Sequence, residues 1–223
     1  LYDEGIRIPL IIRFPGAVSP ASRTEAMVSH ADLMPTLMEA AGGTPPADID
    51  GKSFLAVLKG EQEEHHEFIF ASHTGNAINY PDWKANWSPA RTIRSRTHQY
   101  ILNLNPNYTF TCHITGCGPN RQPAAWHPIW DSWVELAKTD ATAKARVDAF
   151  LHRPQHELYD LTKDPFEKVN LAEHPAYAEI LKQLQTKLAT WRETQGDDLP
   201  VSRNLEEYLS HRPTRGGGYR NLP

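Results

Sequence analysis

The sequence has few cysteines, no long hydrophobic run and no concentration of positive charge. Its two cysteines, Cys112 and Cys117, cannot make a four-cysteine zinc site, because no second pair exists. No apolar run reaches the length that crosses a membrane, and no signal peptide opens the chain. The 23 basic and 27 acidic residues are scattered, with a net charge of −4, so there is no basic stripe for nucleic acid. We therefore expect neither a membrane protein nor a nucleic-acid-binding protein.

What is present is typical of a globular protein. The 223 residues suffice for one large or two small domains, and 39% of them are hydrophobic while 22% are charged. Eighteen prolines indicate long, shaped loops. The chain starts at Leu1 rather than at methionine, and a strand-like run begins within five residues. We therefore expect the sequence to be a part of a larger protein.

Residues 157–171, ELYDLTKDPFEKVNL, form the most informative pattern. The first five alternate as in a strand, with Leu158 and Asp160 facing away from Tyr159. Pro165 then prevents the strand from continuing, because proline has no N–H to donate. Asp160 and Asn170 are placed to hydrogen-bond nearby backbone and hold the turn. The segment predicts a strand, a tight turn and the approach to a helix.

The same pattern, ELYDL..DP.E..NL, resembles a segment near the C-terminus of type I sulfatases, the formylglycine-dependent branch of the alkaline-phosphatase superfamily. Two further segments resemble that family in the same order: VSHADLMPTLMEAAGG over residues 28–43, and DGKSF over residues 50–54. The ending NLN at residues 103–105, the tryptophan-rich insert that follows it and WRET at residues 191–194 resemble sulfamidases, the heparan N-sulfatases, within the family.

Residues 5–14, GIRIPLIIRF, are almost continuously apolar and end at a Pro-Gly turn. This predicts a strand that is buried on both faces of a parallel or mixed sheet. The run LYDEGIRIPLIIRFPG resembles the sulfatase segment that leaves the active site and re-enters the central sheet. In that family a sulfate-binding lysine often lies just upstream of the Leu-Tyr pair, a position that here falls before residue 1.

Residues 32–42 predict a packed amphipathic helix. Asp32 is the expected N-cap, Pro35 suits the first turn, and Gly42 can adopt the left-handed conformation that ends a helix. The apolar residues expected on its buried face are Leu33, Leu37 and Ala40 or Ala41. Further on, His65 and His66 lie in the charged run EQEEHHE. A metal site would need ligands fixed on a rigid face, so we interpret this run as a solvated surface loop.

The second half of the chain predicts a small antiparallel sheet covered by a helix. Residues 68–71 form a short strand, residues 91–105 form a hairpin with its bend at Thr97-His98, and ELYDL completes the sheet. Residues 175–194 carry an apolar stripe at helical spacing, made of Tyr177, Leu181, Leu184, Leu188 and Trp191. We expect Leu184, Leu188 and Trp191 to be buried against Leu158 and Ile101.

The insert between the hairpin and ELYDL, residues 106–154, is the least family-like part. Residues 131–151 predict one or two helices. A disulfide between Cys112 and Cys117 and a pair of free thiols both remain open. Residues 117–121, CGPNR, match the sulfatase activation pattern Cys-x-Pro-x-Arg, but the family's copy lies far upstream of LYDEG, so we interpret the match as chance. Asp197-Asp198 imitates a metal-binding acidic pair outside the family's position.

The resemblance implies an α/β, alkaline-phosphatase-like sulfatase fold, of which this chain is the C-terminal portion with a small antiparallel sheet packed on a helix. We expect residues 1–70 to end the large domain, residues 71–200 to form the smaller one and residues 201–223 to be an extended tail. The intact enzyme would hydrolyse sulfate esters or sulfamates, with glycans or small sulfated compounds as substrates. Its calcium (Ca2+) and formylglycine would lie upstream, in the missing N-terminal catalytic part, so this chain alone would bind neither and be inactive. The resemblance also implies a periplasmic, secreted or lysosomal protein. The alternatives are a non-catalytic carbohydrate-binding or packing module and a phosphodiesterase-like relative.

His73 is the one residue of this chain that we predict to bind substrate. It follows the strand FIFA, and strand ends in α/β enzymes commonly gather ligand contacts. Ser72-His73 with Tyr80-Pro81 resembles the sulfamidase pattern, in which this stretch borders the substrate pocket. An imidazole can donate to a sulfate or sugar oxygen, and its protonated form also supplies charge. The alternative is a structural histidine that bonds loop backbone between Thr74 and Asn79.

Overall fold

The computed structural model describes residues 1–73, 88–110, 112, 115, 127–202, 207 and 210. Within these residues the strands are β1 (Ile69–His73), β2 (Ala90–Arg94), β3 (His98–Asn103) and β4 (His156–Asp160). The α-helices are α1 (Asp3–Ile6), α2 (Leu33–Ala40), α3 (Leu55–Leu58), α4 (His127–Leu136), α5 (Ala141–Leu151) and α6 (Ala178–Thr194). Two 3-10 turns, η1 (His30–Asp32) and η2 (Pro175–Tyr177), precede α2 and α6.

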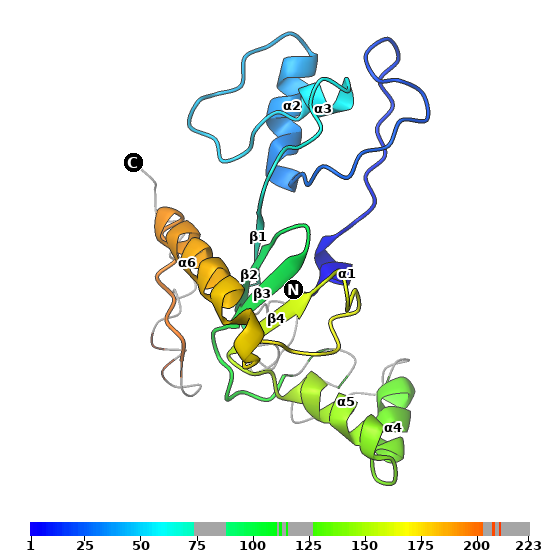
Figure 1. The fold of residues 1–223 in the computed structure, drawn as a ribbon, viewed down its shortest axis with the longest axis vertical. Coiled ribbons are helices and arrows are strands. Elements are labelled where there is room, and N and C mark those ends of the chain that lie inside the picture. Colours follow the sequence, from blue (N-terminus) through cyan, green and yellow to red (C-terminus); the bar gives the residue numbers. More distant parts are fainter. Residues whose placement is uncertain are drawn as a thin grey trace.

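The four strands form one antiparallel sheet in the order β1-β2-β3-β4 (Figure 1). The predicted hairpin is confirmed as β2 and β3, in which Thr92 pairs with Ile101. Strand β4 then pairs with β3, Leu158 opposite Tyr100. The turn after β4 is held as predicted: Asp160 accepts a hydrogen bond from the backbone of Thr162 at 3.1 Å, and Asn170 accepts one from the backbone of Leu158 at 2.9 Å.

Helix α6 covers one face of this sheet. Its residues Leu184 and Leu188 are 0% and 1% exposed and pack with Leu158, as the sequence predicts. Burial of such side chains contributes roughly 1.5–3 kcal/mol each. The prediction for Ile101 is wrong, because Ile101 packs with Ala90 and Tyr159 on the opposite face. Successive strand residues point to opposite faces, so Tyr100, and not Ile101, meets the helix.

The opposite face of the sheet holds the first residues of the chain. Leu1 and Tyr2 pack against the cluster that contains Tyr159, and the hydroxyl of Tyr2 donates to Glu157 at 2.9 Å. Asp3, at the start of α1, pairs with Arg94 of β2. The sheet therefore lies between α6 and the N-terminal residues, with polar and ionic contacts on the second face.

The strand predicted for residues 5–14 is wrong in this structure. Residues 3–6 form helix α1, and residues 7–14 have no regular structure. The side chains of Ile8, Leu10 and Ile11 are 54%, 50% and 91% exposed. A strand buried on both faces needs a partner for its backbone N–H and C=O groups. The four strands described pair only with one another, so none of them offers residues 7–14 a partner for backbone hydrogen bonds.

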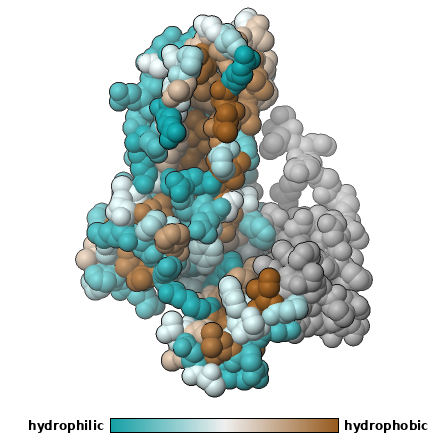
Figure 2. Space-filling model, turned by 90° about the vertical axis from the view of Figure 1, so that its right-hand side faces the viewer, coloured by the Kyte–Doolittle hydropathy of each residue, from teal (hydrophilic) through white to brown (hydrophobic). Residues whose placement is uncertain are grey.

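Helix α2 forms where the sequence predicts it, but its cap and buried face differ. Ser29 begins the turn, and its N–H donates to the Asp32 carboxylate at 2.6 Å in a capping box. Gly42 has the expected positive φ, +80°. Leu37 is 68% exposed, whereas Thr36 is buried and accepts a hydrogen bond from the backbone N–H of Phe54 at 3.0 Å. Figure 2 shows hydrophobic surface over this upper part of the molecule.

Helices α4 and α5 pack against each other in the predicted helical part of the insert. Trp130 of α4 is 6% exposed and lies against Phe150 of α5, with ring centroids 5.1 Å apart. Cys112 is a buried free cysteine, while Cys117 and the rest of CGPNR lie outside the described residues, as does nearly all of the predicted tail. Among the described helices, none is long and apolar enough to cross a membrane. The domain boundaries at residues 70 and 200 stay a prediction.

Candidate functional site at one edge of the sheet

The sheet has one end at which β1 and β3 finish and β2 and β4 begin. We call this end of the strands the edge of the candidate site. His73 is the last residue of β1 and pairs with Ala90, the first of β2. Asn103 ends β3, and its amide donates to the carbonyl of Pro154 at 2.7 Å, just before β4. The antiparallel ladder therefore brings His73 near the segment that contains Arg153, although 80 positions separate them in sequence.

The surroundings of His73 are partly buried and carry positive charge. Burial lowers the pKa of His73, and the charges of Arg153 and Arg91 act in the same direction. A hydrogen bond with the backbone of Ser88 opposes this effect. The ring is therefore neutral over much of the physiological pH range, and the positive charge of Arg153 nearby attracts an anion.

Arg153 is the residue at this edge that sequence reasoning missed. Its guanidinium lies over the Phe110 ring, 3.8 Å from the centroid, and 5.4 Å from the centroid of Tyr2. Its Nε is buried and has no hydrogen-bond partner among the described residues. The Arg153 side chain as a whole is half-buried, and an arginine without a carboxylate partner among the described residues can still bind an anion. The signal available in the sequence was its position: Arg153 directly precedes Pro154 and lies four residues before Glu157, the start of ELYDL.

The buried carboxylate of Glu157 in β4 links β3, β4 and the N-terminal residues near this edge. Glu157 accepts hydrogen bonds from the side chains of Tyr2, Asn103 and Tyr159. Burial raises the pKa of Tyr2 and of Tyr159, and the negative charge of Glu157 raises them further. Both phenols therefore stay protonated and act as donors. These contacts occupy Glu157, so its role is to position the neighbouring chain segments.

Asp197 belongs to an ion-pair network and not to a metal site. Its carboxylate accepts hydrogen bonds from Arg91, at 2.7 and 2.8 Å, and from Arg192, at 2.7 Å. Burial would raise the pKa of Asp197, but the two arginines outweigh it and hold the pKa below its ordinary value. Arg91 also donates to the carbonyl of His73 at 3.2 Å. The network thus joins the end of α6 to the strand end that carries His73.

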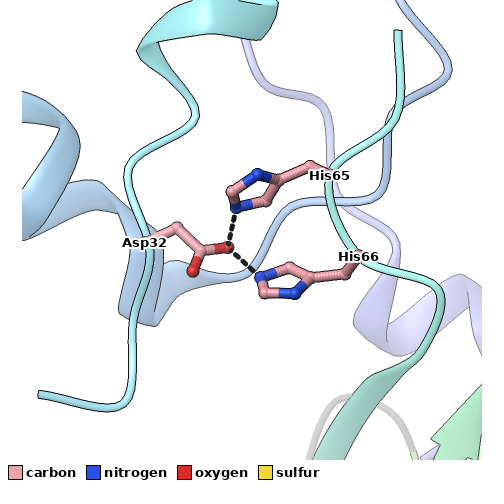
Figure 3. Close-up of side chains that lie close together, drawn as sticks. All are labelled: Asp32, His65 and His66. Carbon is pink, nitrogen blue, oxygen red and sulfur yellow. Dashed lines mark hydrogen bonds and ion pairs between the residues drawn. The ribbon is translucent and has the colours of Figure 1, made fainter. Parts of the chain in front are cut away.

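The interpretation of His65 and His66 as part of a solvated loop is wrong. Their side chains are only 6% and 20% exposed, and both rings point at the carboxylate of Asp32 (Figure 3). The Nε2 atoms lie 3.5 and 2.9 Å from the same oxygen, Oδ2. The three residues come together because η1 and the segment before β1 meet in the folded chain, although they are 33 or more positions apart in sequence.

The comparisons with known proteins agree with the sequence resemblance. The family described as N-sulphoglucosamine sulphohydrolase, C-terminal, matches residues 1–105. An ulvan-active sulfatase of Formosa agariphila is 31% identical over 206 residues, covering 88% of this chain and 35% of that protein. The N-sulphoglucosamine sulphohydrolase of Homo sapiens is 27% identical over 209 residues, covering 86% of this chain and 38% of that protein.

A solved structure has a similar fold. It is described as a complex with its substrate D-glucosamine-2-N,6-O-disulfate, and it superposes with a TM-score of 0.54 at 21% identity over 87% of this chain and 30% of that chain. The small antiparallel sheet packed on α6 is confirmed, and the fold as a whole is similar to that of this solved structure. This chain spans about a third of the length of the curated relatives that it matches. The family match over residues 1–105 and the relatives that align with most of this chain support its placement in the sulfatase family, as the C-terminal part.

Proposed function

We propose that this chain is the C-terminal part of a sulfatase that hydrolyses sulfate esters or sulfamates of glycans, and that it contributes His73 to the rim of the substrate pocket. The observation that supports this most directly is the position of His73 beside Leu1. Leu1 packs against the cluster that contains Ala90, the strand partner of His73. The sulfatase resemblance places a sulfate-binding lysine just before the Leu-Tyr pair, so this edge of the sheet would lie beside the sulfate.

The charges at the edge fit an anionic substrate. His73 can donate a hydrogen bond to a sulfate or sugar oxygen, and Arg153 supplies a guanidinium that no described carboxylate neutralises. A sulfated amino sugar of the kind named for the solved structure with a similar fold carries the negative charge that such a site favours. We infer that His73 and Arg153 bind the glycan next to its sulfate group and leave the chemical step to residues outside this chain.

The family's calcium and formylglycine do not fit the residues described here. Calcium takes six to eight oxygen ligands, and the grouping of metal-ligating side chains found among the described residues is one carboxylate with two imidazoles. We infer that both groups are held by the part of the enzyme that precedes Leu1 in its relatives. Hydrolysis of glycan sulfates would take place in the periplasm, outside the cell or in the lysosome.

The test compares the intact enzyme with its His73→Ala and Arg153→Ala variants on a sulfated glucosamine and on a small aryl sulfate. Loss of a contact to the sugar should lower kcat/KM for the glycan about tenfold or more and change the aryl sulfate far less. Residues 1–223 alone should show no turnover of either substrate. Turnover by residues 1–223, or glycan kinetics that both variants leave unchanged, would overturn the proposal. Glycan binding by an intact protein that lacks turnover would support the carbohydrate-binding alternative.

A further inference from the structure

Asp32, His65 and His66 offer three ligand atoms, a carboxylate oxygen and two ring nitrogens, that all lie within 4.8 Å of one another. From Oδ2 of Asp32 the two nitrogens are 2.9 and 3.5 Å away. Zinc bonds of about 2.0–2.1 Å in a tetrahedral arrangement place neighbouring ligand atoms about 3.3 Å apart. These two distances lie on either side of that value, so a rearrangement of the rings around Oδ2 would admit an ion.

A second observation points to a ligand that is not a protein group. Nε2 of His65 is buried and makes no well-formed hydrogen bond to any described residue. Its side chain is directed at Asp32, and the contact of Nε2 with Oδ2 is long, 3.5 Å. Burying a ring nitrogen with only such a contact is unfavourable, because its lost hydration is not fully replaced. A bound metal would coordinate this nitrogen. It would also take the place of the proton in the hydrogen bond between Nε2 of His66 and Oδ2 of Asp32.

The three ligands are already fixed in place. The Asp32 carboxylate accepts hydrogen bonds from the backbone N–H of Ser29 at 2.6 Å and of Lys52 at 2.9 Å. The His65 ring packs edge-on against Phe54, with centroids 6.0 Å apart. Such contacts orient metal ligands before the metal binds and strengthen the site. The backbone of His66 also donates to the carbonyl of Met27 at 3.2 Å, which holds the segment before β1 close to the residues that lead into η1.

We propose that Asp32, His65 and His66 form a binding site for a divalent transition metal, with zinc the best fit. Two imidazoles and one carboxylate are ligands typical of zinc, whereas calcium requires more oxygen ligands. Three protein ligands leave a fourth position for water or for an external ligand. Bound zinc would join η1 to the segment that enters β1 and so stabilise the turn that begins α2.

The experiment uses the protein that contains residues 1–223, freed of any affinity tag and treated with a chelator. Zinc titration by calorimetry should show one site of micromolar or tighter affinity, and zinc should raise Tm by about 5 °C when it is well above its Kd. Calcium at the same concentration should not replace zinc at this site. His65→Gln and His66→Gln should each weaken zinc binding at least tenfold. His30→Gln is the matched control, because His30 is exposed on the same turn and outside the cluster.

The ligand atoms can be identified without any variant. Zinc X-ray absorption of the wild-type protein should show nitrogen and oxygen ligands, including two imidazoles, and no sulfur. Absence of a stoichiometric zinc site, sulfur ligation by the cysteines, or equal zinc affinity in His65→Gln and His30→Gln would each overturn the proposal. Circular dichroism verifies that the variants are folded, and if they are not, the absorption spectrum of the wild-type protein decides.

Discussion

The indole ring of Trp191 stacks on the ring of Phe70, with centroids 5.1 Å apart and planes inclined by 6°. Trp191 is near the end of α6 and Phe70 is in β1, the strand that ends in His73. The pair therefore fastens the last turns of the helix to the edge strand of the sheet. Both residues lie at the border of the core cluster that contains Leu188, so the stack shields the core from water.

Trp191→Ala should destabilise the protein by about 2–3 kcal/mol, slightly less than the roughly 3–5 kcal/mol for a fully buried tryptophan, because Trp191 is partly exposed. Urea denaturation followed by circular dichroism measures this. Trp133→Ala is the control, since Trp133 is 50% exposed on α4, and it should cost less than about 1 kcal/mol. Equal losses for the two variants would show that the stack does not contribute.

Gly51→Ala should disturb the turn that holds Asp32. A Cβ on Gly51 would lie 1.9 Å from the carbonyl oxygen of Ala31, a contact that only a backbone shift can relieve. We expect a loss of about 2–3 kcal/mol, and weaker zinc binding if the metal site exists. Gly5→Ala meets no atom within 4 Å and should leave stability within about 0.5 kcal/mol of the wild type. A Gly51→Ala protein of unchanged Tm would contradict the close approach.

Glu167 makes stability depend on pH. Burial raises its pKa to about 7 from the model-peptide value of 4.5, and its Oε1 has no hydrogen-bond partner among the described residues. The folded state holds the proton more tightly than the unfolded state, so this stabilisation is complete below about pH 4.5. It is lost as pH rises to about 7, by less than the roughly 3 kcal/mol that the full shift corresponds to, because solvent screens part of the effect. Chemical denaturation between these pH values should show the decline, and Glu167→Gln should flatten it. An unaltered pH profile in Glu167→Gln would refute this assignment.

Asp197→Asn should leave two arginines without their carboxylate. Arg91 and Arg192 have side chains that are 6% and 17% exposed, and an unpaired charge at such depth is costly. We expect a loss of about 2–4 kcal/mol in the free energy of unfolding. Asp198→Asn is a matched control, since the neighbouring Asp198 is exposed and should tolerate the change. If Asp198→Asn were equally destabilising, the ion-pair network would not be the cause.

Several parts of the fold are determined by the local sequence. The hairpin β2-β3, the alternation of β4, the turn held by Asp160 and Asn170, and the stripe of α6 all appear where the sequence predicts them. Each depends on neighbours within a few residues: strand alternation, a proline that breaks the strand, or apolar residues at helical spacing. The sulfatase resemblance carried by ELYDL is of the same kind, because a short run of residues defines it.

Tertiary structure alone decided which faces are buried and which side chains meet. An apolar run predicts burial, but only a partner strand makes a ladder, and residues 7–14 have none among the strands described. Leu37 lies on the predicted apolar face of α2 and is exposed, because Phe54 and its neighbours pack on the Thr36 side. The charges around His73, and the approach of His65 and His66 to Asp32, join residues far apart in sequence. Sequence patterns report the chemistry of each residue and its near neighbours, whereas these contacts exist only after the chain has folded.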